Sequence, residues 1–392
     1  MRIQRTLPPT SAPVSLKKLY GGLRGLLSLN SDTAWLESDL KEYFGVKHAF
    51  LVSSGKAALY IILKELKKIN PGKKSVVVPA YTCFSVPSAI VKAGLKVVPC
   101  DINNQTFDFD YNQLEKSINE DTLCVIPSHL FGIPSDMDRI NTLCREKDVF
   151  IVEDAAQAMG IKYKNKPAGS MGDVGFFSLG RGKNITCGSG GIILANSDII
   201  ADRIKNTYAS LERPDSWENV RELTLMSVLY VFSNPILYWL PAGLPFLGLG
   251  ETVYHEDFPV KKLSGMKAGL LRFWRDELEC GNRVRRKNGS LLSQELNVRK
   301  GIDADYLRFP VIMKDKSLQK KISAISKDRG LGISCMYPSP LNEIEEIKEH
   351  FTNRAFPSAK MVSEQLITLP THHFVLEKDI KRAVQLLRGL TE

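Results

Sequence analysis

The sequence lacks the cysteine and histidine patterns that define disulfide frameworks and zinc sites. Its seven cysteines are an odd number, and no two of them form a Cys-x-x-Cys motif. No His-Glu-x-x-His motif occurs either, so no metal site is expected. Cysteines without paired spacing are typical of reducing compartments. We therefore expect an intracellular, cytoplasmic protein without disulfides.

A signal peptide and a continuous transmembrane run are also missing. Residues 1–15 carry arginines and prolines but no apolar core of roughly 7 to 15 residues, so no signal peptide is expected. Residues 223–250 contain no charged side chain and are long enough to cross a bilayer. Pro235, Pro241 and Pro245 break any continuous helix there, so we expect no transmembrane helix.

Three interpretations of the uncharged segment 223–250 stay open. It can be a hydrophobic flap in a dimer interface or in the core, a lid over an active site, or a hairpin that dips into the membrane interface. Its aromatic residues and the nearby Lys261, Lys262 and Lys267 suit interfacial docking. Peripheral membrane association is therefore one alternative for an otherwise cytoplasmic protein.

The length and the order of apolar segments predict an α/β protein with two domains. The chain has 392 residues, of which 43% are apolar, so it can bury a large core and is too long for one compact domain. Strand-like and helix-like stretches alternate from about residue 46 to 194, which predicts a mostly parallel sheet. We expect a large domain at 1–276, with an apolar insertion at 223–250, and a small α+β domain at 277–392. Residues 307–313 are predicted as a strand and 379–387 as the closing helix.

The net charge of +10 does not by itself indicate a nucleic-acid partner. The basic cluster at 283–287 lies in a predicted helix, but no nucleic-acid recognition motif accompanies it. A solvated helix face is the simplest interpretation, and a substrate rich in phosphate is another. We expect no nucleic-acid binding.

An acid and a lysine stand where a pyridoxal phosphate enzyme would need them. In residues 149–158, a short apolar run ends in Asp154 and small residues follow. This pattern predicts a buried strand with an acid at its carboxyl end. Lys183 follows among glycines, five positions after Ser178. The acid can keep a pyridine nitrogen protonated, and the lysine can form a Schiff base. Each feature alone has a simpler explanation, as a helix cap and as a solvated loop charge.

A third segment, residues 49–66, predicts an anion cradle. An apolar strand leads through a small polar turn into an amphipathic helix, where Ser53 or Ser54 can cap the helix. Gly55 lets a ligand approach the backbone, and the free N–H groups with the helix dipole favour a phosphate. An ordinary capped helix is the alternative interpretation.

Together and in this order, the segments resemble the DegT/DnrJ/EryC1/StrS family of sugar aminotransferases, which are fold type I pyridoxal phosphate enzymes. A seven-stranded, mostly parallel sheet in the large domain is therefore expected. The motifs that carry the resemblance cover most of the chain and lie at 53–59, 78–82, 97–101, 126–132, 152–158, 169–173 and 177–186.

The resemblance assigns roles around the ring of the cofactor. Lys183 is implied as the lysine that bonds to pyridoxal 5'-phosphate and moves the proton. Asp154 is implied as the partner of the pyridine nitrogen, and Gln157 lies beside the phenolic oxygen. Ala156, in the same motif, is expected to contact the cofactor.

The resemblance also assigns a phosphate site, with departures from the family pattern. Ser178 matches the phosphate-binding serine, and Ser54 and Gly55 match the turn that holds the phosphate. Lys56 replaces the usual threonine, and either adds a cation to the phosphate or points into solvent.

Two further departures concern the stacking residue and the partner subunit. Where the family has a stacking aromatic ring, this chain has Cys83, so Tyr81 is our prediction for that role. The family's cross-subunit asparagine is absent from 258–264, where Lys261 or Lys262 is a possible substitute.

The function implied is an aminotransferase that moves an amino group, with glutamate as expected donor, onto a nucleotide-linked or lipid-linked keto sugar for polysaccharide or cell-surface glycan biosynthesis. A homodimer is implied as well. Lysine at 183 weighs against the related dehydratases, which carry histidine there. Two alternatives stay open: a non-catalytic regulatory or membrane-associated scaffold protein that binds the cofactor, and another pyridoxal phosphate reaction on an amino acid.

Overall fold

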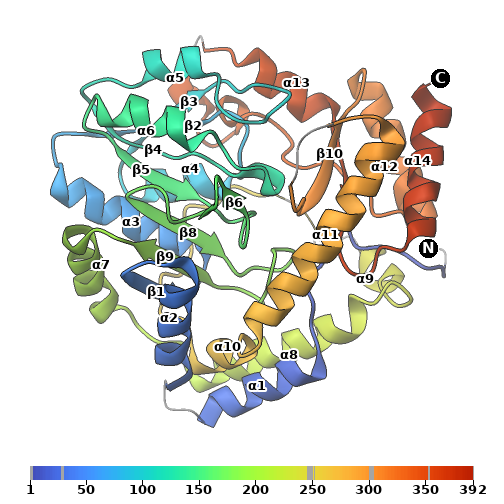
Figure 1. The fold of residues 1–392 in the computed structure, drawn as a ribbon, viewed down its shortest axis with the longest axis horizontal. Helices are drawn as coiled ribbons and strands as arrows, with labels where there is room; N and C mark the ends of the chain where they lie inside the picture. Colours follow the sequence, from blue (N-terminus) through green and yellow to red (C-terminus); the bar gives the residue numbers. More distant parts are fainter. Residues whose placement is uncertain are drawn as a thin grey trace.

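The computed structural model describes residues 3–27, 31–244, 250, 252–299, 304–351 and 354–391. Its centre is a seven-stranded sheet of order β1-β9-β8-β5-β4-β2-β3 (Figure 1). Neighbouring strands from β3 to β8 are parallel, and β9 is antiparallel to both β8 and β1. The predicted mostly parallel sheet is confirmed. Its strands are β1 (His48–Val52), β2 (Ser75–Pro79), β3 (Lys96–Cys100), β4 (Thr122–Val125), β5 (Phe150–Asp154), β8 (Val174–Ser178) and β9 (Gly191–Ala195).

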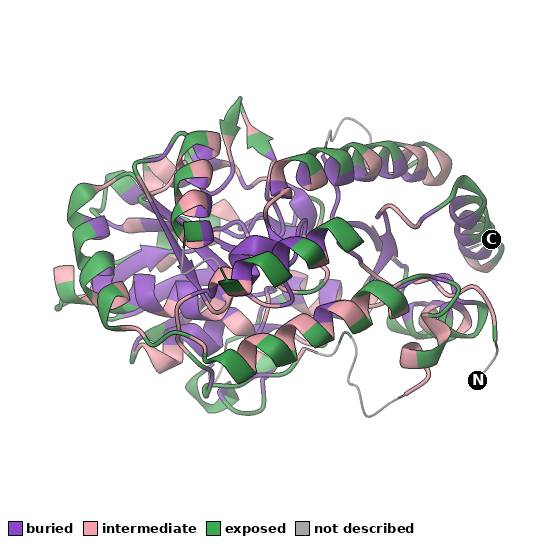
Figure 2. Ribbon diagram, turned by 90° about the horizontal axis from the view of Figure 1, so that it is seen from below, coloured by how far each residue is buried: buried purple, intermediate pink, exposed green. Residues whose placement is uncertain are grey.

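Helices cover both faces of this sheet, so its strands are apolar on both sides. In β2, Val76 and Val78 pack against α3 (Gly55–Ile69) and α4 (Ser85–Lys92), whereas Val77 packs on the opposite side. Figure 2 shows the buried sheet behind the surface helices. The other covering helices are α7 (Asp198–Ser210) on the face of α3, and α2 (Ser31–Phe44), α5 (Tyr111–Ser117) and α6 (Met137–Arg145) on the opposite face.

The C-terminal part is built on a two-stranded antiparallel sheet of β10 (Arg308–Ile312) and β11 (Leu366–Pro370). The strand predicted at 307–313 and the helix predicted at 379–387 are both confirmed. The long helix α11 (Trp274–Leu296) passes through the expected domain boundary at 276/277, so the chain enters the C-terminal part inside one helix. The other elements are α12 (Lys316–Arg329), α13 (Pro357–Gln365), α14 (Glu377–Thr391), β6 (Lys162–Tyr163), β7 (Lys166–Pro167), η1 (Leu130–Gly132), η3 (Leu341–Glu343) and η4 (Lys348–Phe351).

Below the sheet in Figure 1 lie α1 (Leu16–Leu27), α8 (Ser216–Phe232) and α10 (Gly265–Leu270). The short helix α9 (Trp239–Ala242) lies to their right, near the N-terminus. The uncharged segment 223–250 forms the second half of α8 and then α9, although 245–249 are outside the described residues. Met226 and Pro235 are its buried members, so most of the described segment lies at the surface. Within the described part of the chain, no helix combines the length and hydropathy that a membrane crossing requires.

The N-terminal residues 3–15 run between the two parts of the molecule. The Thr6 N–H donates to the Pro235 carbonyl at 2.8 Å, and the Leu7 N–H donates to the Gly330 carbonyl at 2.9 Å. Further along, the Thr10 hydroxyl donates to the carbonyl of Gly182 at 2.9 Å. This N-terminal segment therefore connects the C-terminal part with the loop that carries Lys183.

Candidate active site

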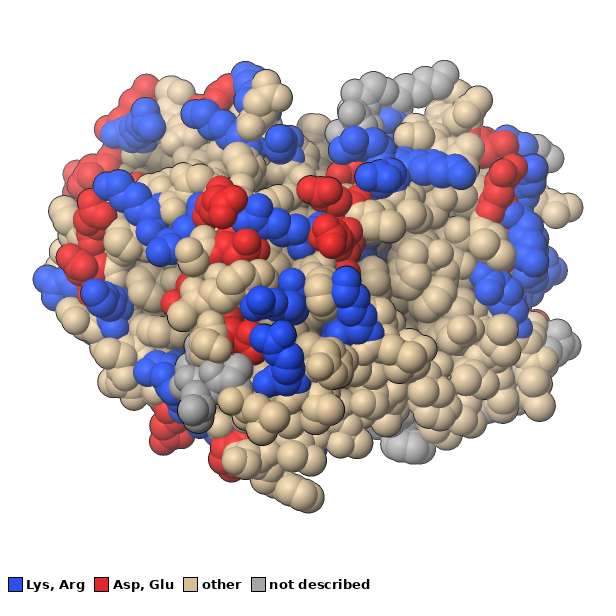
Figure 3. All heavy atoms as spheres, turned by 60° about the horizontal axis from the view of Figure 1, so that its bottom comes forward, with Lys and Arg blue, Asp and Glu red and all other residues tan. Residues whose placement is uncertain are grey.

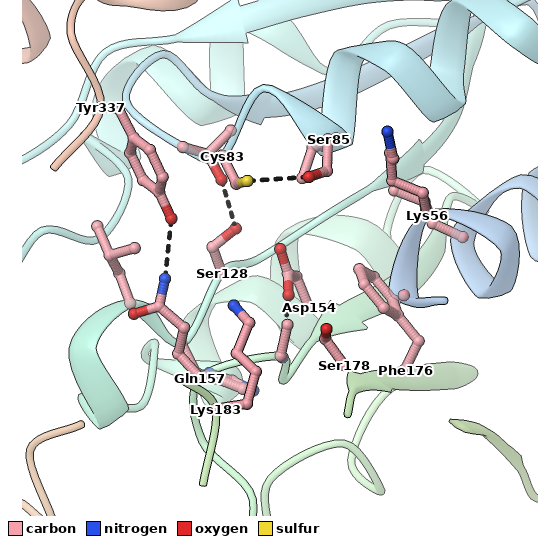
Figure 4. A pocket seen from close by; sticks show the side chains of 17 residues that line it. Lys56, Cys83, Ser85, Ser128, Asp154, Gln157, Phe176, Ser178, Lys183 and Tyr337 are labelled. Carbon is pink, nitrogen blue, oxygen red and sulfur yellow. Dashed lines mark hydrogen bonds between the residues drawn. The ribbon is translucent and has the colours of Figure 1, made fainter. Parts of the chain in front are cut away.

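A cavity opens at the carboxyl edge of the central sheet, where open α/β folds bind ligands. Eight residues proposed from the sequence line it: Gly55, Lys56, Cys83, Asp154, Ala156, Gln157, Ser178 and Lys183. Sequence reasoning did not assign the remaining lining residues to the cofactor: Leu59, Thr82, Ser85, Val86, Ser128, His129, Leu130, Phe176 and Tyr337. Figure 4 shows the side chains converging from several strand ends.

Asp154 ends β5 and is the buried acid of the cavity. Its backbone is fixed on both sides, because its N–H donates to the Pro127 carbonyl at 2.8 Å and its carbonyl accepts from His129 at 3.0 Å. Oδ1 accepts the Ala156 N–H at 3.0 Å. Burial raises the pKa of Asp154, while the backbone hydrogen bond and the positive charge of Lys183 counteract this rise. A cation bound beside Asp154 would stabilise its charged form further.

Lys183 projects into the cavity from the loop after β8, and Figure 4 shows its amino group between Asp154 and Ser128. The loop is supported from behind by Arg285, a fully buried residue of α11. The Arg285 guanidinium donates to the carbonyls of Lys183 and Asn184, each at 3.4 Å. It also reaches the Ser11 carbonyl at 3.3 Å. Burial lowers the pKa of Arg285 to about 10, so the group is cationic at neutral pH.

The expectation that the basic cluster 283–287 is a solvated helix face is wrong for Arg285. Its side chain enters the interior, where Asn282 accepts from it at 3.1 Å and itself donates to the Met159 carbonyl at 2.9 Å. The neighbouring Arg286 instead pairs with Asp305 at 2.6 Å. Sequence reasoning missed Arg285 because a run of basic residues does not reveal which one points inward.

The start of α3 and the end of β8 form the predicted anion cradle. A Cβ atom at Gly55 would lie 3.0 Å from Cβ of Ser178, so the missing side chain allows this approach. A Cβ atom at Gly191 would lie 2.2 Å from the Ser54 carbonyl oxygen, so glycine is needed there too. The first N–H groups of a helix have no intrahelical partner, and the helix dipole adds positive potential. This arrangement suits a phosphate.

Two predicted residues of this region do not line the cavity. Ser54 is the N-cap of α3, and its hydroxyl accepts the Ala57 N–H at 3.1 Å. Tyr81 follows β2 and is 1% exposed, because its ring packs in the core at 5.3 Å from the ring of Tyr337. The structure thus places Tyr81 behind the cavity wall and corrects its assignment as the stacking residue. Cys83 does line the cavity, with Sγ 3.0 Å from Oγ of Ser85.

Lys56 lies at the cavity, with its amino group 4.9 Å from the centre of the Phe258 ring. Lys92 contacts the same ring at 4.6 Å. Burial lowers the pKa of Lys56, and the charge of Lys92 lowers it further. The two other lysines proposed for a phosphate contact bind within their own subunit. Lys261 pairs with Glu218 at 2.7 Å, and Lys262 donates to the Ala209 carbonyl at 3.0 Å.

Gln157 is held in one orientation by both ends of its amide. Its Oε1 accepts the Phe131 N–H at 3.1 Å, and its Nε2 donates to the Tyr337 hydroxyl at 2.8 Å. Burial raises the pKa of Tyr337 well above its usual value, so this hydroxyl stays neutral. Tyr337 comes from the C-terminal part of the chain, and no motif around it pointed to the site.

Two buried histidines have structural hydrogen bonds. His129 lines the cavity, yet its Nε2 lies 2.9 Å from Glu153 and its Nδ1 accepts the Ser135 N–H at 3.1 Å. His372 is buried, with Nε2 2.9 Å from the Pro8 carbonyl. Across the described residues, no three or more histidine, cysteine, aspartate or glutamate side chains are grouped to hold a metal ion.

Comparisons with known proteins agree on one family and one fold. The model of the DegT/DnrJ/EryC1/StrS aminotransferase family matches residues 24–225 and 258–388. A GDP-perosamine synthase of Caulobacter vibrioides is 34% identical over 202 residues, which cover 49% of this chain and 54% of that protein. A pleiotropic regulatory protein of Geobacillus stearothermophilus is 26% identical over 349 residues, 86% of this chain and 82% of its own. The match thus spans about half the length of several curated relatives, the synthase among them.

Solved structures resemble the chain over its whole length. One is the Helicobacter pylori aminotransferase PseC, described as involved in pseudoaminic acid biosynthesis, with a TM-score of 0.80 and 17% identity over 98% of this chain and 99% of its own. Another is a putative sugar aminotransferase of Streptococcus pneumoniae in its PLP form, with a TM-score of 0.77 and 21% identity over 98% of both chains. At these identities the likeness shows the fold, and the predicted fold type I architecture is confirmed.

Proposed function

The chain belongs to the DegT/DnrJ/EryC1/StrS aminotransferase family, and from this premise we propose that it is a pyridoxal phosphate-dependent aminotransferase acting on a keto sugar. One observation carries the proposal. A lysine, a buried acid and an anion cradle, which come from separate segments of the chain, line a single cavity: Lys183, Asp154 and the contact of Gly55 with Ser178. Pyridoxal phosphate has an aldehyde that reacts with an amine, a basic ring nitrogen and an anionic phosphate, and the three features match these groups.

The residues of the cavity fit the cofactor. Burial disfavours the charged form of Asp154, so a pyridinium nitrogen beside it would stabilise the carboxylate, in addition to the charge of Lys183. The Gly55–Ser178 contact leaves a helix start open for the phosphate, with Lys56 as an additional cation at the cavity. When bound, pyridoxal phosphate supplies an electron sink for the carbon that loses its proton.

The chain's own residues then position and move protons. With the cofactor bound, Asp154 would hold the proton on the ring nitrogen. The amide of Gln157, which Phe131 and Tyr337 keep in one orientation, would lie beside the phenolic oxygen. Lys183 carries the proton to and from the substrate carbon, as a general acid and base within reach of the cavity. The buried wall, which includes Phe176 and Tyr337, limits the access of water.

We infer that the acceptor is a nucleotide-linked keto sugar, or a lipid-linked one, used in glycan biosynthesis. The names of relatives such as GDP-perosamine synthase support a nucleotide sugar. The net charge of +10 suits a substrate that bears phosphates. Glutamate as amino donor, a cytoplasmic location and a homodimer that supplies further phosphate contacts belong to the same proposal.

The test is the absorbance spectrum of the protein with pyridoxal phosphate, before and after glutamate. We expect a visible band that glutamate removes, as in a half reaction that precedes the sugar. Lys183→Ala should abolish this change, whereas Lys162→Ala, at an exposed lysine of β6, should retain it. Failure of the wild-type protein to bind the cofactor would exclude the proposal.

The match to a pleiotropic regulatory protein supports one alternative, a cofactor-binding protein without turnover. The same spectrum separates the two functions. A regulator would show a Lys183-dependent band that glutamate and other amino donors leave unchanged. An aminotransferase would lose the band with the right donor and recover it with the keto sugar.

A further inference from the structure

Helix α1 exposes a stripe of large apolar side chains. Leu16, Tyr20, Leu23 and Leu27 are 66%, 66%, 54% and 82% exposed. Their spacing of four, three and four residues places them on one side of the helix. Leu19 and Leu26 of the same helix pack against the core, so the exposed stripe is a second apolar side of α1.

Helix α8 exposes a second stripe. Trp217, Val220, Val228 and Val231 are 75%, 47%, 44% and 42% exposed, again at helical spacing. Beyond the end of α8, Ile236 is 68% exposed. We call the outward sides of α1 and α8, with these nine side chains, the apolar face.

The two stripes form one surface because α1 and α8 lie against each other. A Cβ atom at Gly22 of α1 would lie 3.2 Å from Cδ1 of Leu223 in α8. Figure 2 shows both helices side by side on the outside of the molecule. In Figure 3, the lower part of the surface is broad and carries few charged groups. Monomeric proteins rarely expose contiguous apolar areas of this kind without a partner.

The inward sides of both helices are already occupied. Cβ atoms at Gly21 and Gly25 would each lie 2.4 Å from backbone oxygens of α10, so α1 packs there through glycines. In α8, Met226 is fully buried, and its sulfur would lie 3.2 Å from a Cβ atom at Gly188. The exposed side chains therefore have no place in the protein's own core.

Most of the apolar face is outside what the family model describes. The match begins at residue 24 and omits residues 226–257. Three of the four exposed residues of α1 precede it, and Val228, Val231 and Ile236 fall in the omitted segment. Most of the face therefore lies outside the residues that the family model matches.

The charges beside the stripes identify the partner. Lys17, Arg24 and Arg221 are exposed on α1 and α8, and Arg221 lies 4.0 Å from the carboxylate of Glu222. The acids of α8 are turned to lysines of the body, since Glu218 pairs with Lys261 and Glu222 with Lys267. A second copy of the chain would bring the same exposed cations to the contact. An anionic lipid surface complements them instead, and it accepts Trp and Tyr rings at the headgroup level.

We propose that the apolar face docks the enzyme on anionic membranes, with α1 and α8 lying in the plane of the headgroups. The inner side of α8 contacts the loop after Lys183 through Gly188, so the docked surface is continuous with the frame of the site. The inference concerns location and does not depend on the proposed reaction.

The test is flotation of the purified protein with vesicles of phosphatidylcholine alone and of phosphatidylcholine mixed with phosphatidylglycerol. We expect binding to the mixed vesicles that weakens at high salt. The double variant Leu23→Asp/Val228→Asp should lower the bound fraction at least about tenfold, because each aspartate would enter the headgroup boundary. Ile199→Asp is the matched control, since Ile199 is 70% exposed on α7, away from the face.

Two results would overturn the proposal. The first is a wild-type protein that floats with neither kind of vesicle. The second is a loss of vesicle binding in Ile199→Asp that is as large as the loss in the double variant. Sedimentation velocity of the same variants examines the competing partner, a second copy of the chain. A double variant that changes mass while vesicle binding persists would assign the face to self-association. Unchanged thermal melting of the variants establishes that they are folded, and the glutamate half reaction reports separately on the proposed function.

Discussion

Arg285 illustrates how one buried side chain can position another, the amine of Lys183, through hydrogen bonds to the backbone alone. It donates to the backbone carbonyls of Lys183 and Asn184, and it has no place in the cavity lining. Its effect on Lys183 therefore acts through the loop backbone. Displacement of a reactive group by about 1 Å can cost about 10²-fold in rate.

We predict that Arg285→Met slows the glutamate half reaction by about 10- to 100-fold while the cofactor still binds. Stopped-flow absorbance measures the rate, and a titration with pyridoxal phosphate measures affinity. Arg286→Met is the matched control, because Arg286 follows Arg285 in the same helix and pairs with Asp305. Equal slowing in both variants would mean that the effect is general destabilisation. Partial recovery in Arg285→Lys is expected from the retained charge.

The substitution Gly55→Ala adds one carbon atom to the phosphate cradle and so tests it. The added Cβ of Gly55→Ala would lie 3.0 Å from Cβ of Ser178, so α3 and β8 must separate slightly. We expect affinity for pyridoxal phosphate to fall by about tenfold, roughly 1.4 kcal/mol. Gly72→Ala is the control, since a Cβ atom there meets nothing within 4 Å. Equal affinity of the Gly55 variant and the wild-type protein would place the phosphate elsewhere.

At the scale of elements, His372 links the N-terminal segment to the turn after β11. Its Nε2 bonds to the Pro8 carbonyl, and its Nδ1 accepts the Phe374 N–H at 3.3 Å, so the neutral ring satisfies both partners. Burial lowers the pKa of His372 to about 3, and burial also lowers that of His373 to about 4. Protonation of either ring thus favours the unfolded chain.

The pKa of His372 is depressed in the folded protein, so protonation of His372 destabilises the fold once the pH falls below its pKa in the unfolded chain, near 6.5. Between about pH 6 and 4 the unfolded state binds one more proton at this site, which costs about 1.4 kcal/mol per pH unit. We expect the melting temperature of the wild-type protein to fall over this window more steeply than that of His372→Gln. Chemical denaturation at several pH values measures the difference. Parallel slopes for the two proteins would exclude the role of His372.

Elements were predictable wherever the pattern was local. The valines of β2 and the Ser54–Gly55 turn announce a buried strand and a helix start in a few residues, and the structure has both. Short motifs also indicated Lys183 and Asp154, and both line the cavity. In contrast, Tyr81 was misassigned because its neighbours in space, such as Tyr337, are distant in sequence. Arg285 and Tyr337 were missed for the same reason, since only tertiary packing turns them toward the site.

At the scale of the whole molecule, the apolar face and the cavity belong to different layers of one body. The face is made by α1 and α8 below the sheet, whereas the cavity lies at the carboxyl edge of the strands (Figure 1). Substitutions that add charge to the apolar face should therefore alter membrane binding without altering the absorbance spectrum of the bound cofactor. The sequence had left the segment 223–250 with three interpretations, because composition alone does not show which side of a helix is already packed.

The N-terminal segment has a consequence for the order of assembly during synthesis. Arg5 pairs with Asp379 at 2.9 Å, and these two residues are separated by 374 positions. The contact of Thr10 with Gly182 lies on the same segment. During synthesis, this segment cannot complete its contacts until α14 has been made, because Asp379 lies in that helix. The loop of Lys183 therefore gains the full support of the segment only at that stage.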